Sequence, residues 1–180
     1  MIMTPPWRKF MLTTHVVTSV GLLGAIASFL LLAVAGLVSP DAEMVRAAYP
    51  AMALIASAII VPLAFAALLI GIIESLGTKW GLVRHYWLVV KLVLTVVAIV
   101  VLLLQMRTVS YLGYAAGAGT IAGVELNGPR MAMVLHSAGG LLVLLVPMAL
   151  SVYKPRGRTK WGRVATQQKH MSPAAGSNSS

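Results

Sequence analysis

From Phe10 to Val38 the chain reads FMLTTHVVTSVGLLGAIASFLLLAVAGLV, a run without a single Asp, Glu, Lys or Arg. A helix needs roughly 20 residues to cross the hydrocarbon core of a bilayer, and this run exceeds that length. The run is also about twice as long as the roughly 7–15-residue core of a cleavable signal peptide, so we expect it to be retained. It therefore predicts a first transmembrane helix.

Three further apolar runs follow along the chain. They extend over residues 51–76, 86–106 and 131–153. Lipid contains no water to satisfy backbone N–H and C=O groups, so each run must be helical. We therefore predict an all-α polytopic membrane protein with a four-helix transmembrane bundle. The bundle occupies residues 10–163, between a cytoplasmic N-terminus over 1–9 and a disordered cytoplasmic tail over 164–180.

The composition supports a membrane environment. Hydrophobic residues make up 59% of the chain, charged residues 10%, and the mean hydropathy is +0.90, whereas a soluble domain carries about 25% charged residues. The net charge of +10 would suggest a nucleic-acid partner for a soluble protein. Here, however, the basic residues flank the apolar runs, which is typical of membrane orientation. We expect the lipid bilayer, and no nucleic acid, as a partner.

The basic residues are distributed unevenly about the four runs. If the N-terminus is inside, eleven of the fourteen fall on the cytoplasmic side: Arg8, Lys9, Lys79, Arg84, Lys91, Lys154, Arg156, Arg158, Lys160, Arg163 and Lys169. Arg46, Arg107 and Arg130 fall on the other side. Because Lys and Arg are enriched in cytoplasmic segments, both termini are predicted to be cytoplasmic. The predicted location is the cell membrane, as a multi-pass protein.

Helix ends and bends are also marked in the sequence. The motif Ser39-Pro40-Asp41 predicts an N-cap at Ser39 followed by an N1 proline and an acidic first turn, and Asn127-Gly128-Pro129 predicts the start of the fourth helix. Pro50 and Pro62 are expected to kink the second helix. The Gly- and Ala-rich segment 108–128 is expected to be the only sizeable loop.

Small residues indicate how the helices pack. In the first helix a stripe of them repeats at spacings of four and three: Thr14, Thr18, Gly21, Ala25 and Ser28. The fourth helix carries small residues over 137–140. Such stripes let helix backbones approach closely in lipid, so they predict tight packing, within the bundle or with a partner.

An inner layer of polar residues is predicted near the cytoplasmic boundary. A rise of about 1.5 Å per residue places His15, Glu74, His85 and Lys91 in this layer. Ionisable residues inside a span are costly and usually face the bundle interior. We expect an ion pair or extension to the interface for Glu74 and Lys91, and an interfacial position for His85. For His15 we expect a hydrogen bond to another helix.

An outer layer consists of His136 and Gln105, which are expected to be neighbours. Roughly 12–17 Å along the membrane normal separates His136 from His15, so we do not expect these two histidines to hold one haem. A haem or metal ion held by His15 and His85 is compatible with their depths. The candidate cofactor-binding residues are therefore His15, His85 and His136.

The sequence also contains a short motif that occurs twice. Thr-Lys-Trp-Gly occurs at 78–81, after the second run, and again at 159–162, after the fourth. A duplicated two-helix hairpin would produce this repeat. Two independent interfacial anchors of the same chemistry would also produce it, and this second interpretation is preferred because the runs themselves do not align.

Four motifs carry a resemblance to a known family. They are THV at 14–16, RHYW at 84–87, LHSAGG at 135–140 and SVYKPRG at 151–157. Over residues 7–163 the chain resembles a family of bacterial four-span integral membrane proteins whose activity is uncharacterised. That family often has a His near the outer end of the third span, where this chain has Gln105. More remotely, the chain is similar to copper-resistance D-type membrane proteins and their haem-associated relatives, which implies a haem or copper link.

No nucleotide-binding loop, acid pair or nucleophile with a base occurs in the chain. We therefore expect a non-enzymatic structural or accessory membrane protein, forming a homo-oligomer or joining a membrane-protein partner. The first alternative is a haem-, metal- or quinone-binding protein that uses His15, His85 or His136. The second alternative is a small transporter or channel in which Lys91, Glu74 and His15 line a polar path.

Overall fold

The computed structural model describes residues 4–77, 86–119 and 126–153. The elements are α1 (Pro5–Val38), α2 (Ala42–Ile55), the π-helical turn η1 (Ala56–Ile60), α3 (Val61–Gly77), α4 (Tyr86–Gly117) and α5 (Asn127–Tyr153). These described residues contain no strand. The prediction for His85, the repeated Thr-Lys-Trp-Gly motif and the predicted disordered tail lie outside the described residues.

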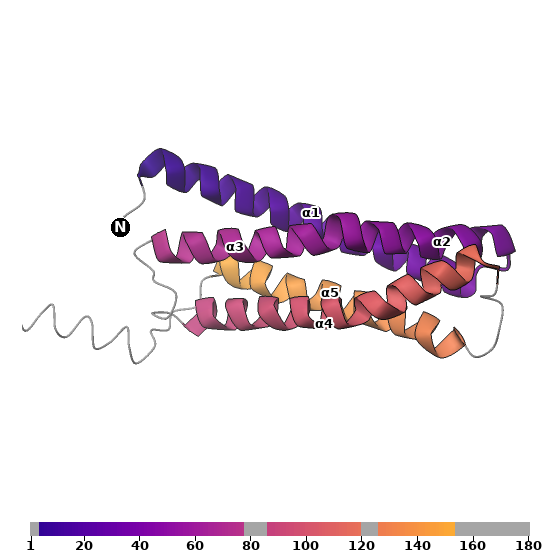
Figure 1. Cartoon of the computed structure of the whole chain (residues 1–180). Helices are drawn as coiled ribbons and strands as arrows, with labels where there is room; N and C mark the ends of the chain where they lie inside the picture. Colours follow the sequence, from indigo (N-terminus) through magenta and orange to yellow (C-terminus); the bar gives the residue numbers. More distant parts are fainter. Residues whose placement is uncertain (1–3, 78–85, 120–125, 154–180) are drawn as a thin grey trace, which may run out of the picture.

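The described chain has four helices long and apolar enough to cross a membrane. They are Pro5–Val38, Ala42–Leu76, Leu88–Gly117 and Asn127–Val146, the second being continuous through α2, η1 and α3. Successive helices run in opposite directions, so the start of α1 and the end of α5 lie at the same end of the bundle (Figure 1). This confirms the predicted fold class, an all-α four-helix bundle of a multi-pass membrane protein.

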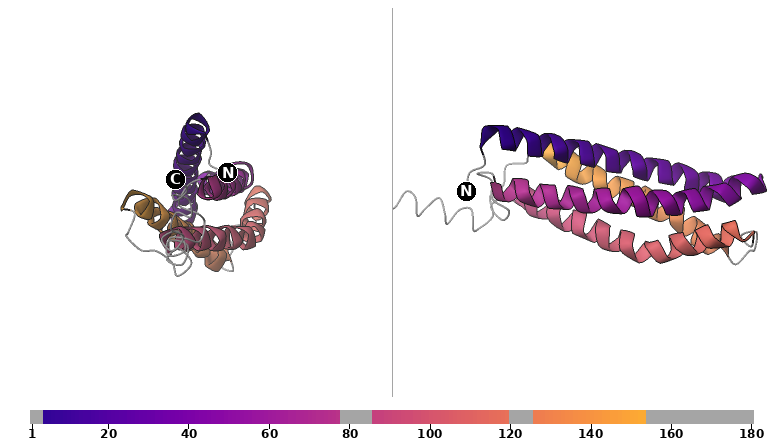
Figure 2. Two further views of the ribbon diagram at one scale, coloured as in Figure 1. Left: turned by 90° about the vertical axis from the view of Figure 1, so that its left-hand side faces the viewer. Right: turned by 45° about the horizontal axis from the view of Figure 1, so that its top comes forward.

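The four helices form a ring in which each packs on two neighbours. The helix α1 packs on α5 and on the continuous α2–η1–α3 helix, and α4 packs on the same two partners. Among the described residues the backbones of α1 and α4 do not approach each other, nor do those of α3 and α5. The first turns of α1 diverge from the other helices (Figures 1 and 2). Helices α1 and α4 are therefore diagonal to each other.

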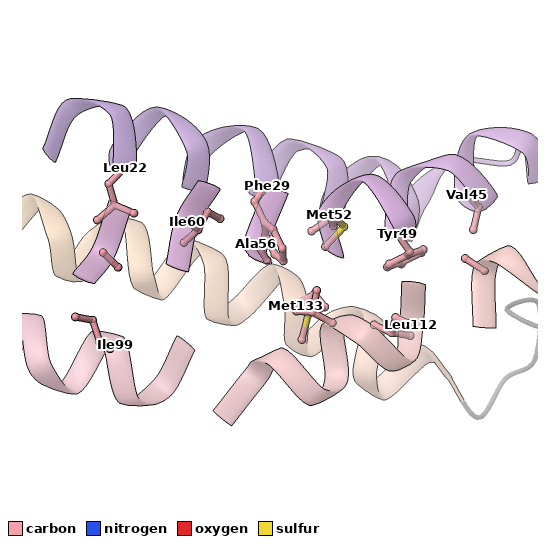
Figure 3. Packing of buried hydrophobic residues seen from close by; sticks show 14 residues of the cluster. Leu22, Phe29, Val45, Tyr49, Met52, Ala56, Ile60, Ile99, Leu112 and Met133 are labelled. Atoms are coloured by element: carbon pink, nitrogen blue, oxygen red, sulfur yellow. The ribbon is translucent and has the colours of Figure 1, made fainter. Parts of the chain in front are cut away.

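The core of the bundle is narrow, and its largest fully buried side chains are Tyr49, Met52, Leu112 and Met133 (Figure 3). Large apolar side chains cover the outside instead: Leu31, Leu54 and Leu104 are 70%, 67% and 70% exposed. A water-soluble protein rarely exposes contiguous apolar surface on this scale. The outer face of the bundle is therefore suited to lipid.

The second helix begins two residues later than predicted. Asp41, rather than Ser39, is its N-cap, because the Asp41 carboxylate accepts a hydrogen bond from the Glu43 N–H at 2.9 Å. Ser39 instead ends α1, where its N–H donates to the Ala35 carbonyl. Its hydroxyl oxygen accepts from the Asp41 N–H at 3.2 Å. Both residues thus satisfy backbone groups of the connection between α1 and α2.

The second span continues through both of its prolines. Pro50 lies inside α2, and Pro62 follows the π turn η1. At the end of this turn the Val61 N–H donates to the Ala56 carbonyl, five residues back instead of four. Because a proline ring clashes with the carbonyl four residues before it, a wider turn immediately before Pro62 relieves that contact. The helix is thereby continued rather than broken.

The loop predicted over 108–128 is wrong in its first half, because α4 continues to Gly117. Leu112 and Ala116 are fully buried there. Gly113 lies so close to α2 that a Cβ atom on it would be 3.1 Å from the Cβ of Ala53. Close packing on α2 thus stabilises as helix a segment whose Gly- and Ala-rich composition indicated a loop.

The stripe of small residues predicted on α1 coincides only in part with its buried face, at Thr18. The buried residues of α1 are Thr18, Leu22, Phe29, Ala33 and Gly36. Two members of the predicted stripe, at 21 and 28, are exposed. The buried face thus includes the large side chains at 22 and 29, which point into the interior of the bundle (Figure 3).

Candidate functional site

A cavity of about 100 Å³ lies in the middle of the bundle and is lined by residues from all four spans. Its walls are mostly apolar and include the core residues Leu22, Phe29, Ala56, Ile60, Ile99 and Met133 (Figure 3). Four polar side chains also line it: Thr95 and Gln105 from α4, and His136 and Ser137 from α5. The surface of the cavity is nevertheless almost entirely apolar, so these four residues line it mainly with carbon atoms.

Two residues that line the cavity also reach the surface of the bundle. Val101 of α4 and His136 of α5 both line the cavity and are both exposed. Gly140 widens the chamber, since a Cβ atom added to it would have no neighbour within 4 Å. The same holds for Gly139, so this pair does not mediate close helix packing within the bundle. From the exposure of Val101 and His136 we infer an opening between α4 and α5, toward the side of the bundle.

The hydrogens of three polar groups in the cavity are donated to the backbone of their own helices. The hydroxyl of Thr95 donates to the Lys91 carbonyl at 2.8 Å, and that of Ser137 to the Met133 carbonyl at 2.6 Å. The Nδ1 atom of His136 is 2.6 Å from the Ala132 carbonyl oxygen. A carbonyl can only accept, so Nδ1 carries the hydrogen.

The predicted outer layer is therefore partly correct. His136 and Gln105 line the same cavity from adjacent helices. The Nδ1–H of His136 is donated to the Ala132 carbonyl on its own helix. Among the described residues, the two side chains thus share a chamber without bonding to each other.

A second polar group, the inner cluster of His15, Glu74 and Lys91, joins three helices. The Lys91 ammonium of α4 lies 3.3 Å from Nε2 of His15 on the diagonal helix α1. Glu74 of α3 interacts electrostatically with Lys91. The interhelical hydrogen bond predicted for His15 is present, with Lys91 as its partner. The three residues that were predicted to share an inner layer thus lie together.

Room for the His15 ring is made by Gly71 of α3, where a Cβ atom would be 3.3 Å from the ring carbon Cε1. An ammonium group can only donate, so Nε2 of His15 accepts and the hydrogen of the neutral ring is on Nδ1. Nδ1 is buried and forms no hydrogen bond with a described residue, although the Ala67 carbonyl lies near the ring. Of the two ring nitrogens of His15, only Nε2 thus forms a hydrogen bond with a described residue.

The two histidines that the structure describes belong to different sites. His136 lines the cavity and His15 does not, as their predicted depths indicated. The cavity does not fit the haem implied by the family resemblance. A space of about 150 Å³ is filled by one benzene ring, and a porphyrin is several times larger than the roughly 100 Å³ here. Within the described residues, no three His, Cys, Asp or Glu side chains are grouped closely enough to hold a metal ion.

A third polar contact at the opposite end of the bundle was missed by the sequence analysis. Arg130 of α5 donates to the Tyr49 hydroxyl at 2.9 Å and to the carbonyl of Gly36. Its guanidinium lies 5.8 Å from the centre of the Tyr49 ring. The sequence identified Arg130 as an outer charge, because nothing in it showed that α1, α2 and α5 meet there. This contact ties three helices together.

The cavity and the inner cluster are thus the two candidate functional sites, and the Arg130 contact is structural. The cavity is open toward the side of the bundle, whereas the inner cluster is partly buried between helices. In comparisons with known proteins, no family model, no curated protein and no solved structure matches this chain.

Proposed function

We propose that this protein is a non-enzymatic integral membrane protein that binds a small lipophilic molecule in its central cavity. The observation that carries the proposal is the exposure of Val101 and His136, which line the cavity from α4 and α5 and from which we infer an opening between these helices. A molecule dissolved in the bilayer would enter there without passing through water. Small-molecule sites are lined predominantly by apolar side chains, and the surface of this cavity is almost entirely apolar.

The unfilled space also favours a binding role over a purely structural one. Side chains around such a space forgo packing contacts that larger residues would make. A larger residue at Gly140 would fill part of it without a clash, because a Cβ atom there meets nothing within 4 Å. Glycine at this position keeps the chamber open.

The proposed orientation has the start of α1 and the end of α5 in the cytoplasm, with the protein in the cell membrane. Its support is the positive-inside bias, with eleven basic residues on one side and three on the other. The even number of crossings places both of these ends on the same side of the bundle. In this orientation the inner cluster faces the cytoplasmic leaflet.

The proposed function is tested by ligand binding to the full chain in lipid nanodiscs. We expect xenon, an apolar atom that binds in empty apolar cavities, to bind saturably at one site per chain, after subtraction of its partitioning into empty nanodiscs. Gly140→Leu places a side chain in the cavity and should weaken binding at least tenfold. Gly139→Leu is the matched control, because Gly139 has equal free space but does not line the cavity.

Two results would contradict the proposal. One is the absence of a saturable component in the native chain. The other is an equal effect of the two leucine substitutions, which would place the binding site elsewhere. Helical content and elution as a single species show that each variant remains folded.

A further inference from the structure

We infer that the cavity takes an unbranched hydrocarbon chain, either the acyl chain of a membrane lipid or a free chain of the same kind, rather than a compact molecule. The inference rests on the proposed function, because it names the class of ligand for the same cavity. It follows from the length, the narrowness and the apolar surface of the cavity.

The cavity is elongated parallel to the helices. Its lining residues recur on one face of α4 over 95–109 and on one face of α5 over 133–144, and they cover 22–29 of α1 and 56–64 of the second span. With a rise of about 1.5 Å per residue, these stretches extend over roughly 21 Å of α4, roughly 16 Å of α5 and roughly 10–12 Å of the other two helices. The acyl chains of one leaflet occupy half of a hydrocarbon core about 30 Å thick. The cavity is therefore long enough for most of one acyl chain.

The cavity is also narrow for its length. A compact cavity of about 150 Å³ holds one benzene ring. The volume here is only about 100 Å³ and is distributed over several helical turns. Its cross-section is therefore too small for a molecule that is wide in two directions, such as a cage of fused rings. A hydrocarbon chain is one methylene group thick along its whole length, so its shape fits this space.

Shape, rather than polarity, selects the ligand. The surface of the cavity is almost entirely apolar, and lipid tails are equally apolar, so leaving the bilayer for the cavity gains no hydrophobic free energy. The gain comes from dispersion contacts with the lining side chains, and each of these contacts requires close approach. A chain that follows the cavity makes such contacts along its length, whereas a compact molecule leaves most of the wall without contacts.

The inferred opening lies at a depth that suits a chain. Val101 lines the cavity, is exposed, and lies halfway along α4, which extends from Tyr86 to Gly117. The middle of a membrane-spanning helix is near the midplane of the bilayer, where the free ends of acyl chains meet. A chain can therefore enter by its free end while its polar head group stays at the interface. No polar group has to enter the apolar cavity.

The experiment measures xenon binding to the full chain in nanodiscs of diphytanoyl phosphatidylcholine, whose methyl-branched chains do not fit a narrow cavity. The same lipid serves for the xenon measurement that tests the proposed function. The competitors are n-decane and adamantane, which have the same number of carbon atoms and no polar group, but which are a chain and a cage. At equal concentrations in the membrane, we expect decane to weaken xenon binding at least about tenfold and adamantane less than about twofold. Gly139→Leu, outside the cavity, should show the same difference.

A second lipid identifies the source of the chain. In nanodiscs of straight-chain dimyristoyl phosphatidylcholine, weaker xenon binding than in the branched lipid would show that the acyl chain of a membrane lipid enters the cavity. Equal xenon binding in the two lipids, with competition by decane retained, would assign the cavity to a free chain.

The remaining outcomes overturn one claim or both. If adamantane displaced xenon as well as decane does, or if neither displaced it, the cavity would not be selective for a chain. The proposed function would then still stand, because xenon would still bind. Absence of saturable xenon binding in the branched-lipid nanodiscs would overturn the proposed function and, with it, the inference.

Discussion

Three glycines show how single residues determine the helix contacts. Each lies opposite a side chain of another helix: Gly36 faces Tyr49, Gly71 faces His15 and Gly113 faces Ala53. In each case an added Cβ atom would lie 2.9 to 3.3 Å from that side chain. These glycines thus allow close approach, whereas Gly24, Gly139 and Gly140 have open space around them. The sequence alone does not distinguish the two kinds.

The contact at Gly36 gives a prediction about stability. A Cβ atom in Gly36→Ala would be 2.9 Å from the Tyr49 ring, which is 1% exposed and held by the hydrogen bond from Arg130. Because the ring cannot move away easily, we expect the free energy of unfolding to fall by about 1–3 kcal/mol. Gly24→Ala, in open space on the same helix, should instead raise stability by up to about 1 kcal/mol, since alanine is the better helix former.

Reversible unfolding in mixed micelles, followed by circular dichroism, measures both variants. If Gly36→Ala were as stable as the native chain, the close packing of α1 on Tyr49 would be wrong. The comparison with Gly24→Ala separates this contact from the general effect of replacing glycine in a helix.

At the scale of elements, the inner cluster connects two helices that have no backbone contact. Lys91 of α4 reaches His15 of α1 across the diagonal of the ring, at the end where α1 diverges. The sequence predicted that His15 and Lys91 share a depth, because depth follows from the helical rise. It did not predict that they bond to each other, because bonding depends on the rotation of each helix about its axis.

This link predicts an energetic coupling between the two helices. In a double-mutant cycle of His15→Leu and Lys91→Met, we expect a coupling of about 0.5–1.5 kcal/mol in the free energy of unfolding, the usual worth of one hydrogen bond. Lys91→Met combined with His136→Leu, which belongs to the other site, should be additive. A coupling near zero for the first pair would show that the contact between Lys91 and His15 contributes nothing to stability.

Element boundaries were predicted less well than element identities, for physical reasons. The helix α4 extends to Gly117 because its last turns pack on α2, and such tertiary packing overrides the loop propensity of Gly and Ala. The cap of α2 is Asp41 because Ser39 is used to end α1. Two adjacent capping residues do not by themselves show which of them serves which helix.

For the whole molecule, the number of spans followed from hydropathy, but the ring order did not. In a soluble helix, apolar residues mark the buried face. In α4, Ile99 is 6% exposed and Leu104 is 70% exposed, although both are large aliphatic residues. Because the core and the lipid both accept apolar side chains, the sequence does not show which face turns inward. The cavity and its opening therefore could not be predicted.

The account depends most on the four crossings, because an opening between α4 and α5 admits a lipophilic molecule only if it faces lipid. The chain contains no cysteine, so single cysteines introduced at Thr4, Ser39, Gly117 or Lys160 can be labelled cleanly with a membrane-impermeant maleimide in intact cells. We predict labelling of Ser39→Cys and Gly117→Cys from outside, and labelling of Thr4→Cys and Lys160→Cys only after the cells are opened. Labelling of Thr4→Cys and Gly117→Cys from the same side would contradict the four-span arrangement and, with it, the lipid-facing cavity.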